Sequence, residues 1–311
     1  MIKYLVTGGA GFIGSHLAET LVRRGHRVRV LDNLSSGSLT NIEPFRSDVE
    51  FIEGDLCNAD CVRRATQGVE VVLHQGALAS VSRSVEDPRS THEVCATGTL
   101  NVLLAARDCG VRRVLYAASS SAYGDAFAPP NHEDQTPNPL SPYAAAKLTG
   151  EHYCSTFTHV YGLETVRLRY FNVFGPRQDP ASPYSAVIPL FITAMLAGRA
   201  PTIFGDGQQS RDFTYIKNIV HANLLAADAK NVAGKVFNVA TGESASLLDL
   251  IAAINGILNT KIVPSHQPAR AGDVRHSRAD ISRARAELGF EPTVNLQEGL
   301  RRAVEYYRAG K

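Results

Sequence analysis

The chain has 311 residues, of which 44% are hydrophobic and 20% are charged, and its formal net charge is +2. This composition is typical of a globular protein, and so small a net charge does not indicate a nucleic-acid partner. The longest apolar run, "SAVIPLFITAMLAG", contains a proline and is too short to cross a bilayer, so no membrane partner is expected.

Seven short apolar runs predict buried strands, and the first two are "KYLVTG" and "HRVRVLD". The remaining five, in chain order, are "VEFIEGD", "VEVVLHQGA", "RRVLYAASS", "LETVRLRYFN" and "KVFNVA". Helical segments such as "GSHLAETLVRRG" lie between most of them. This alternation predicts an α/β fold with a doubly wound parallel sheet.

The alternation weakens after residue 171, where turn-rich pieces such as "GPRQDPASPYS" and "FGDGQQSRD" predict a smaller, mixed C-terminal lobe. Residues 1–171 and 213–240 are therefore expected to form the domain with the large sheet. Residues 172–212 and 241–311 are expected to form the lobe that binds the substrate.

Three glycines, Gly8, Gly11 and Gly14, lie between the first predicted strand and the first predicted helix. Glycines there let the backbone and the helix N-terminus approach a pyrophosphate, although a glycine-rich turn without a ligand is the simpler alternative. Asp32 ends the next strand, 18 residues after Gly14. A carboxylate in that place can accept hydrogen bonds from an adenosine ribose and would repel a 2′-phosphate. The pattern therefore predicts a Rossmann domain that binds NAD rather than NADP.

The segment "SPYAAAK" places Tyr143 and Lys147 on one face of a predicted helix that Ser141 and Pro142 would begin. The YxxxK pattern alone is weak evidence, because these residue types are common enough to match by chance. A second signal is "YAASSSAYG", which ends a strand with three serines on the side of a parallel sheet where ligands bind. Serines at strand ends are otherwise turn formers. With the predicted cofactor, the two signals together indicate a catalytic site.

These residue types suit the removal of a proton from a substrate hydroxyl while a hydride leaves. A free tyrosine has a pKa of about 10. A nearby ammonium group and a positively charged nicotinamide would favour its phenolate form. We therefore predict that Tyr143 is the base, that Lys147 supplies the fixed positive charge and holds the ribose, and that Ser119 orients the hydroxyl.

Six motifs carry a family resemblance: "TGGAGFIG", "SSSAYG", "YAAAK", "LRYFNVFGPRQ", "GDGQQSRDF" and "ARAGDVRHSRADISRA". Through them, nearly the whole chain resembles the UDP-galactose 4-epimerase family of extended short-chain dehydrogenases/reductases. The resemblance implies a tightly bound NAD and a 4-epimerase that acts on UDP-hexoses. It also implies that the tyrosine takes the 4-hydroxyl proton, and that the 4-keto sugar turns over before its other face is reduced.

The resemblance also assigns individual residues to the cofactor and to the UDP-sugar. The cofactor set comprises Gly8, Gly11, Phe12, Ile13, Gly14, Asp32, Asn33, Ser35, Ser36, Gly37, Asp55, Leu56, Gln75, Gly76, Ala77, Tyr143, Lys147 and Phe171. The substrate set comprises Ser119, Ser121, Asn172, Val187, Arg211, Arg270, Asp273 and Ser277. Within that set, Arg211 and Arg270 match the arginines that hold the diphosphate, and Asp273 matches an acid at the ribose.

Two positions depart from the family pattern. Cys95 stands where the family often has Asn, so a hydrogen bond usually made there would be absent or replaced. Ser277 stands where epimerases limited to UDP-glucose and UDP-galactose usually carry a bulky Tyr. Members that accept 2-acetamido sugars, UDP-GlcNAc and UDP-GalNAc, carry a small residue there. The alternative is that Ser277 merely caps a helix.

Other functions remain open on the sequence. UDP-glucuronate 4-epimerase is chemically close, whereas sugar-nucleotide dehydratases and decarboxylases place a carboxylate after the strand-end serine, where this chain has Ser120 and Ser121. A dinucleotide-binding regulator without activity would commonly lack the tyrosine or the lysine, and both are present here.

The five cysteines form no CxxC pair, and no zinc pattern accompanies them, so no metal site is expected. Reduced thiols, and a glycine-rich stretch that begins too early for a signal peptide, predict a cytoplasmic protein. By family analogy we expect a homodimer that pairs the helix through "TGTLNVLLAARD" with the helix that carries Tyr143.

Overall fold

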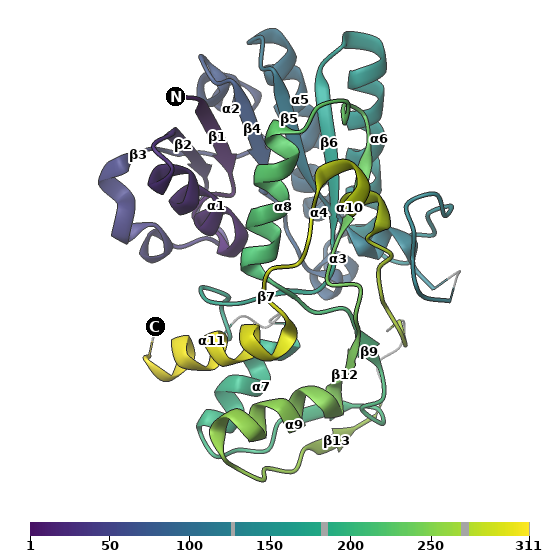
Figure 1. The fold of residues 1–311 in the computed structure, drawn as a ribbon. Coiled ribbons are helices and arrows are strands. Elements are labelled where there is room, and N and C mark those ends of the chain that lie inside the picture. Colours follow the sequence, from purple (N-terminus) through teal and green to yellow (C-terminus); the bar gives the residue numbers. More distant parts are fainter. Residues whose placement is uncertain (126–127, 182–185, 269–273, 311) are drawn as a thin grey trace.

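The computed structural model describes residues 1–125, 128–181, 186–268 and 274–310. Its centre is a seven-stranded parallel sheet in the order β11-β6-β5-β4-β1-β2-β3 (Figure 1). The strands are β1 Lys3–Thr7, β2 Arg27–Asp32, β3 Val49–Glu53, β4 Val71–His74, β5 Arg113–Ser119, β6 Glu164–Tyr170 and β11 Val236–Val239. Each lies within one of the seven apolar runs, so the predicted doubly wound sheet is confirmed.

Alternate side chains of the strands enter two separate hydrophobic clusters. Tyr4 and Val6 of β1 belong to the cluster that includes α1 (Phe12–Arg23) and α8 (Ile216–Asp228). Leu5 belongs to the cluster on the other face, formed with α2 Ala59–Thr66, α5 Gly98–Asp108 and α6 Pro142–Tyr161. Because helices cover both faces of the sheet, both faces of the central strand β1 bury apolar side chains.

The second lobe gathers below the sheet in the view of Figure 1. Three helices pack together there: α7 Val187–Leu196, α9 Leu247–Leu258 and α11 Leu296–Arg308. Short strands form three further pairs: β7 Val173–Phe174 with β10 Thr214–Tyr215, β9 Ser210–Arg211 with β12 Ala245–Ser246, and β8 Thr202–Phe204 with β13 Ser265–Gln267. The smaller mixed lobe is thus also confirmed.

The chain passes between the two parts more than once. It leaves the sheet after β6, returns through α8 and β11, and leaves again toward α9. A further helix, α10 (Ser282–Leu288), lies beyond residue 241 and yet packs against β11 and α8. The division of the chain at residues 171, 212 and 240 stays a prediction.

The helix that carries the YxxxK motif begins where the sequence predicts. Ser141 is the N-cap of α6, its Oγ accepts a hydrogen bond from the Ala144 amide at 3.2 Å, and Pro142 follows as the first helical residue. Gly162 ends the helix in the left-handed conformation, with φ +68°.

The chain between β4 and α5 forms three short helices. They are α3 Val81–Glu86, α4 Pro88–His92 and the π-helical turn η3 Glu93–Thr97. The other short helical turns are the 3₁₀ segments η1 Leu39–Asn41, η2 Glu43–Asp48 and η4 Ser120–Tyr123. Single π-helical turns within helices are rare and are frequent at functional sites.

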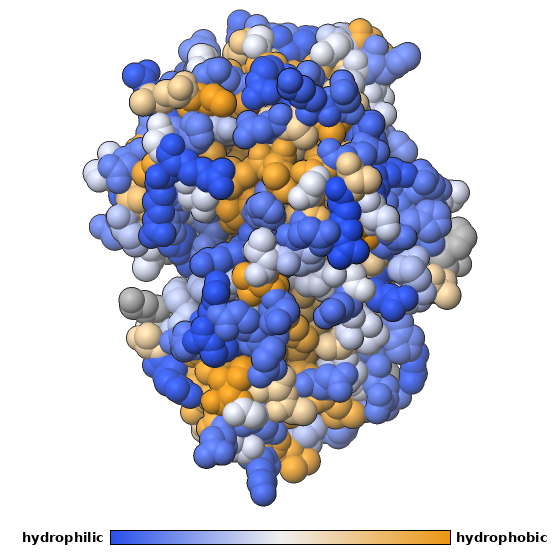
Figure 2. Space-filling model, viewed as in Figure 1, coloured by the Kyte–Doolittle hydropathy of each residue, from blue (hydrophilic) through white to orange (hydrophobic). Residues whose placement is uncertain are grey.

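Hydrophilic residues cover most of the face shown in Figure 2, where the hydrophobic residues form separate patches. Among the described residues, no helix is long and apolar enough to cross a membrane.

Candidate active site

A cavity of about 630 Å³ opens at the carboxyl ends of the central strands. The sheet order reverses there, between β1 and β4, and ligands of doubly wound sheets bind at such a switch point. Phe12 and Ile13 line the cavity from α1, Gln75 and Ala77 line it after β4, and Ser119 lines it at the end of β5.

The glycine-rich loop after β1 lies against neighbouring backbone. Gly8 has φ +65°, and a Cβ atom there would lie 2.7 Å from the Cα of Gly76. A Cβ at Gly14 would overlap the carbonyl oxygen of Gly8. Gly11 is the N-cap of α1, and no side chain caps the first amides of that helix. This cradle beside the cavity fits a pyrophosphate, which uncapped amides and the helix dipole attract.

Asp32 ends β2 beside the glycine-rich loop and is largely buried. Its Oδ2 accepts a hydrogen bond from the Ala10 amide at 2.9 Å, and its Oδ1 accepts one from the Leu34 amide at 2.8 Å. Burial raises the pKa of Asp32, and hydrogen bonds from the amides of Leu34, Ala10 and Gly11 act against that rise. The carboxylate therefore fixes the loop in addition to lying where a ribose is expected.

The loops after β2 and β3 meet near Asp32. Asn33 donates a hydrogen bond from Nδ2 to Oδ2 of Asp55 at 2.8 Å, and the Cys57 amide donates to Oδ1 of Asp55 at 2.8 Å. The Cys57 amide is the main reason why the pKa of Asp55 is lowered. Ser35 donates its amide to Oδ1 of Asn33, so this part of the predicted cofactor set forms one hydrogen-bonded group.

Other members of the cofactor set lie in close van der Waals contact with their neighbours. A Cβ at Gly37 would lie 2.9 Å from Oδ1 of Asp32, and one at Gly76 would lie 2.6 Å from Cδ1 of Leu56. Phe171 is fully buried in a cluster with Tyr123 and is not among the residues that line the cavity.

Ser119, Tyr143 and Lys147 all line the cavity. Oγ of Ser119 accepts hydrogen bonds from the hydroxyl of Ser121 at 2.8 Å and from its amide at 3.2 Å. Lys147 is 3% exposed, and its Nζ lies 4.7 Å from the ring centroid of Tyr116. The end of β5 and the first turns of α6 thus bring the three predicted catalytic side chains to one cavity.

The pKa of Tyr143 differs from the sequence-based expectation. Burial raises it above the usual value, charge on Cys95 adds to the rise, and hydrogen bonding with Ser119 opposes it only in part. Burial also lowers the pKa of Lys147. In the protein without NAD, burial raises the pKa of Tyr143 more than the neighbouring groups lower it, so the chain by itself does not lower that pKa.

Cys95, the position that departs from the family pattern, lies in the π-helical turn η3. It is 1% exposed and shares a hydrophobic cluster with Ala146, against which Tyr143 packs. Cys95 therefore belongs to the cluster against which the predicted base, Tyr143, packs.

Two further cavities share lining residues with the first or with each other. One of about 270 Å³ shares Asn172, Val173, Ala186 and Arg211 with it. The next, of about 560 Å³, shares Val187, Gln209 and Leu247 with the second and is lined mostly by apolar side chains. The three cavities therefore adjoin one another, from the predicted catalytic side chains past Arg211 to an apolar end, and together they are called the cleft below.

Most of the predicted substrate set lines this cleft. Asn172 has φ +31°, which is strained for a residue other than glycine, and its Nδ2 donates to the Asp212 carbonyl at 3.1 Å. Ser277 lines the first cavity, and its amide donates to the Ser210 carbonyl at 3.0 Å. Because α10 begins at Ser282, Ser277 is not a helix cap. Arg270 and Asp273 lie outside the described residues.

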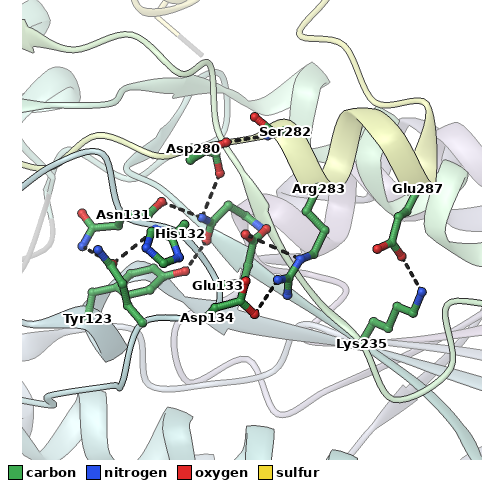
Figure 3. Close-up of polar contacts among 12 residues, drawn as sticks. Tyr123, Asn131, His132, Glu133, Asp134, Lys235, Asp280, Ser282, Arg283 and Glu287 are labelled. Atoms are coloured by element: carbon green, nitrogen blue, oxygen red, sulfur yellow. Dashed lines mark hydrogen bonds and ion pairs between the residues drawn. The ribbon is translucent and has the colours of Figure 1, made fainter.

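The sequence analysis missed a polar centre that adjoins the first cavity, which Tyr123 and Asn131 help to line (Figure 3). The Tyr123 hydroxyl donates to Oδ1 of Asn238 at 2.7 Å, and Nδ2 of Asn238 donates to the carbonyls of Asn131 and Asp280, each at 3.0 Å. The Asn238 amide donates to Glu133 at 2.8 Å. The loop before α6 and the segment after Ser277 are thus tied together. A polar residue inside the apolar run "KVFNVA" was the available signal.

Asp212 forms a second such centre. Its Oδ1 accepts from the amide and hydroxyl of Thr241 at 2.9 and 2.7 Å, and its Oδ2 accepts from the amides of Gly242 at 2.9 Å and Ala279 at 3.3 Å. Burial raises the pKa of this carboxyl group against those hydrogen bonds. The residue next to Arg211 therefore joins the loop after β11 to the segment that carries Ser277.

The doubly wound sheet, the glycine cradle and the Ser-Tyr-Lys cavity define an extended short-chain dehydrogenase/reductase. A family model for the NAD dependent epimerase/dehydratase family matches residues 4–240, and the chain belongs to that family. This membership confirms the resemblance and identifies NAD as the cofactor.

Three relatives illustrate the similarity. A protein of Mycolicibacterium smegmatis named UDP-glucose 4-epimerase is 41% identical, with 99% of each chain covered. A structure of UDP-N-acetylglucosamine 4-epimerase from Methanobrevibacter ruminantium, in complex with UDP-N-acetylmuramic acid, is 40% identical with a TM-score of 0.95, covering 100% of this chain and 99% of that one. A complex of Thermus thermophilus UDP-glucose 4-epimerase with NAD is 38% identical over 100% of both chains, with a TM-score of 0.91.

Proposed function

We propose that the chain is a UDP-hexose 4-epimerase that holds NAD tightly and works through a transient 4-keto sugar. The observation that carries the proposal is the cleft of three adjoining cavities that lead from Ser119, Tyr143 and Lys147 past Arg211 to an apolar end. Such a cleft suits a sugar at the catalytic side chains, a diphosphate at the arginine and a base at the apolar end.

In the proposed reaction, Tyr143 takes the proton of the sugar 4-hydroxyl and later returns it. Ser119 hydrogen-bonds the same hydroxyl and directs it toward the phenolic oxygen, and Lys147 holds positive charge close to both. A bound NAD would supply the hydride acceptor for C4 and the positive charge that favours the phenolate of Tyr143. Gly8, Gly11 and Gly14 would hold its pyrophosphate.

The cavity lining favours epimerisation over elimination of water. None of the described residues that line the catalytic cavity is Asp or Glu. The serines Ser120 and Ser121 follow Ser119, where a dehydratase would need an acid. A 4-epimerase needs no second proton-transfer group beside Tyr143, since the hydroxyl is oxidised with NAD as the hydride acceptor and is then restored.

Substrate turnover tests the proposal directly. Purified protein is incubated separately with UDP-glucose, UDP-GlcNAc and UDP-glucuronic acid, and the products are identified by NMR. We expect the C4 epimers of the first two. Turnover of UDP-glucuronic acid alone would instead assign the chain to the UDP-glucuronate 4-epimerases. A dehydrated or decarboxylated product, or no turnover of any sugar, would refute the proposal.

Cofactor choice is the first prediction. We expect NAD to bind at least about tenfold more tightly than NADP, because the largely buried Asp32 carboxylate would repel a 2′-phosphate. Direct titration of the cofactor-free protein measures both dissociation constants. Asp32→Asn should narrow the difference, since it removes the charge and keeps the shape. Comparable affinity for NADP in the wild type would remove this role from Asp32.

Sugar choice is the second prediction. An epimerase must let the keto sugar turn between two faces, so the pocket needs room for the C2 substituent in two poses. Ser277→Tyr would fill that room, and a filled pocket discriminates by about 1–3 kcal/mol for a single methylene. We expect kcat/KM for UDP-GlcNAc to fall at least ~10-fold, with UDP-glucose affected much less. A wild type that converts UDP-glucose but not UDP-GlcNAc would exclude Ser277 as the gate.

Two further expectations concern the protein as a whole. The homodimer would pair α5 and α6 of two copies, and light scattering at micromolar concentration measures its mass. The cytoplasmic location likewise stays a prediction.

A further inference from the structure

His74 is a buried titratable residue that the proposed mechanism does not use. It ends β4, is 1% exposed, and touches two threonines. Its Nδ1 lies 2.7 Å from Oγ1 of Thr7, and its Nε2 lies 3.0 Å from Oγ1 of Thr99. Thr7 also accepts a hydrogen bond from the Gly76 amide at 3.2 Å, and Thr99 donates one to the Cys95 carbonyl at 2.6 Å.

The two ends of this chain of hydrogen bonds fix its direction. The Cys95 carbonyl can only accept, so the single hydroxyl proton of Thr99 points to it, and Thr99 must accept from Nε2–H of His74. The Gly76 amide can only donate, and it donates to Thr7. The hydroxyl proton of Thr7 is then available to Nδ1, which leaves the imidazole neutral and protonated on Nε2.

The surroundings of the ring agree with that protonation state. Burial, assisted by the positive charge of Lys147, lowers the pKa of His74 to about 3. The Tyr116 ring packs against His74, with its centroid 5.6 Å from that of the imidazole. A second positive charge here would oppose Lys147 and would break the hydrogen bond from Thr7.

We propose that His74 is a positioning residue of the catalytic centre, whose Nε2–H tautomer joins the Gly76 amide in the cofactor cradle to the Cys95 carbonyl behind Tyr143. At one end of this series of hydrogen bonds, Gly76 lies against Gly8. At the other end, Cys95 belongs to the hydrophobic cluster against which Tyr143 packs. The series thus fixes the spacing between cofactor and base, and a displacement of about 1 Å in such a geometry costs up to about 100-fold in rate. The roles given to Gly76 and Tyr143 rest on the proposed function.

The tautomer is measured first, on wild-type protein with ¹⁵N-labelled histidine and no substrate. We expect one histidine with protonated Nε2 and unprotonated Nδ1 from pH 5 to pH 8, and its signals should vanish in His74→Asn. An Nδ1–H tautomer or a charged ring at pH 7 would overturn the proposal, whatever sugar the enzyme converts. This measurement also decides the matter if a variant fails to fold.

Substitutions that remove the hydrogen bonds of Thr7 or of Thr99 then test the function of the series. Thr7→Val should raise the dissociation constant of NAD at least about tenfold, whereas Thr99→Val should lower kcat at least about tenfold with NAD affinity nearly unchanged. Thr66→Val is the matched control, because Thr66 is equally buried, donates to the Val62 carbonyl four residues back at 2.8 Å and is not among the residues that line the cavity. A merely structural role would lower the melting temperature of all three variants and leave kcat and NAD affinity unchanged, and that result would refute the proposal.

Discussion

Tyr143→Phe is expected to keep NAD bound and to lower kcat by about 10²–10⁴, the usual range for loss of a general acid–base group. The phenolic oxygen is the only group removed, and the ring still packs against the cluster that contains Cys95 and Ala146. Steady-state turnover of the preferred UDP-sugar measures kcat, and fluorescence or direct titration measures NAD affinity.

Two variants control this result. Tyr161→Phe makes the same change at the exposed end of the same helix and should leave kcat unaltered. Ser119→Ala should lower kcat less than Tyr143→Phe does, because Tyr143 can still reach the hydroxyl. If Tyr143→Phe retained near-full turnover, the base would have to be another group.

Gly14→Ala is expected to abolish measurable NAD binding or to weaken it by about 100-fold or more. Its Cβ would overlap the Gly8 carbonyl oxygen, and both are backbone positions, so α1 would have to move away from the glycine loop. Overpacking of this kind typically costs about 1–3 kcal/mol of stability. Cofactor titration and thermal unfolding measure the two effects.

Gly256→Ala is the matched control for that substitution. Gly256 also lies in a helix, α9, and a Cβ there would meet no atom within 4 Å. Alanine should therefore stabilise the helix by roughly 0.5–1 kcal/mol, with NAD affinity unchanged. An equal loss of NAD affinity in both variants would contradict the cradle assigned to Gly14.

The large sheet could be predicted because strands buried on both faces contain consecutive apolar residues, as in "VEVVLHQGA" and "RRVLYAASS". The start of α6 could be predicted because Ser141 and Pro142 are local capping signals. The pairs β7–β10 and β9–β12 could not, since two-residue strands have no periodicity. The packing of α10 on β11 depends on contacts between distant segments, which local patterns do not encode.

The residues of the candidate site likewise fall into those that the sequence predicts and those that it does not. Its glycines and the Tyr143–Lys147 pair lie close together in sequence, and their spacing alone indicates their chemistry. His74, Asp212 and Asn238 act through partners 25 to 115 residues away, so only the folded chain reveals them. The lowered pKa expected of Tyr143 with NAD bound stays a prediction, and the rise that burial causes in the chain alone could not be judged from a motif.

The chain's repeated passage between the sheet and the smaller lobe limits how this protein can be rebuilt. The walls of the cleft come from segments on either side of α8 and β11, so a continuous fragment that contains both walls also contains these two elements. A single recombination point between Arg211 and Ser277 would take these two residues from different parents. A recombination point between Asp212 and Thr241 would also divide the clamp that Asp212 forms with Thr241, Gly242 and Ala279. New substrate specificities on this scaffold should therefore arise by point substitution within the cleft, because a lobe grafted without α8 and β11 would need three junctions, at residues 171, 212 and 240.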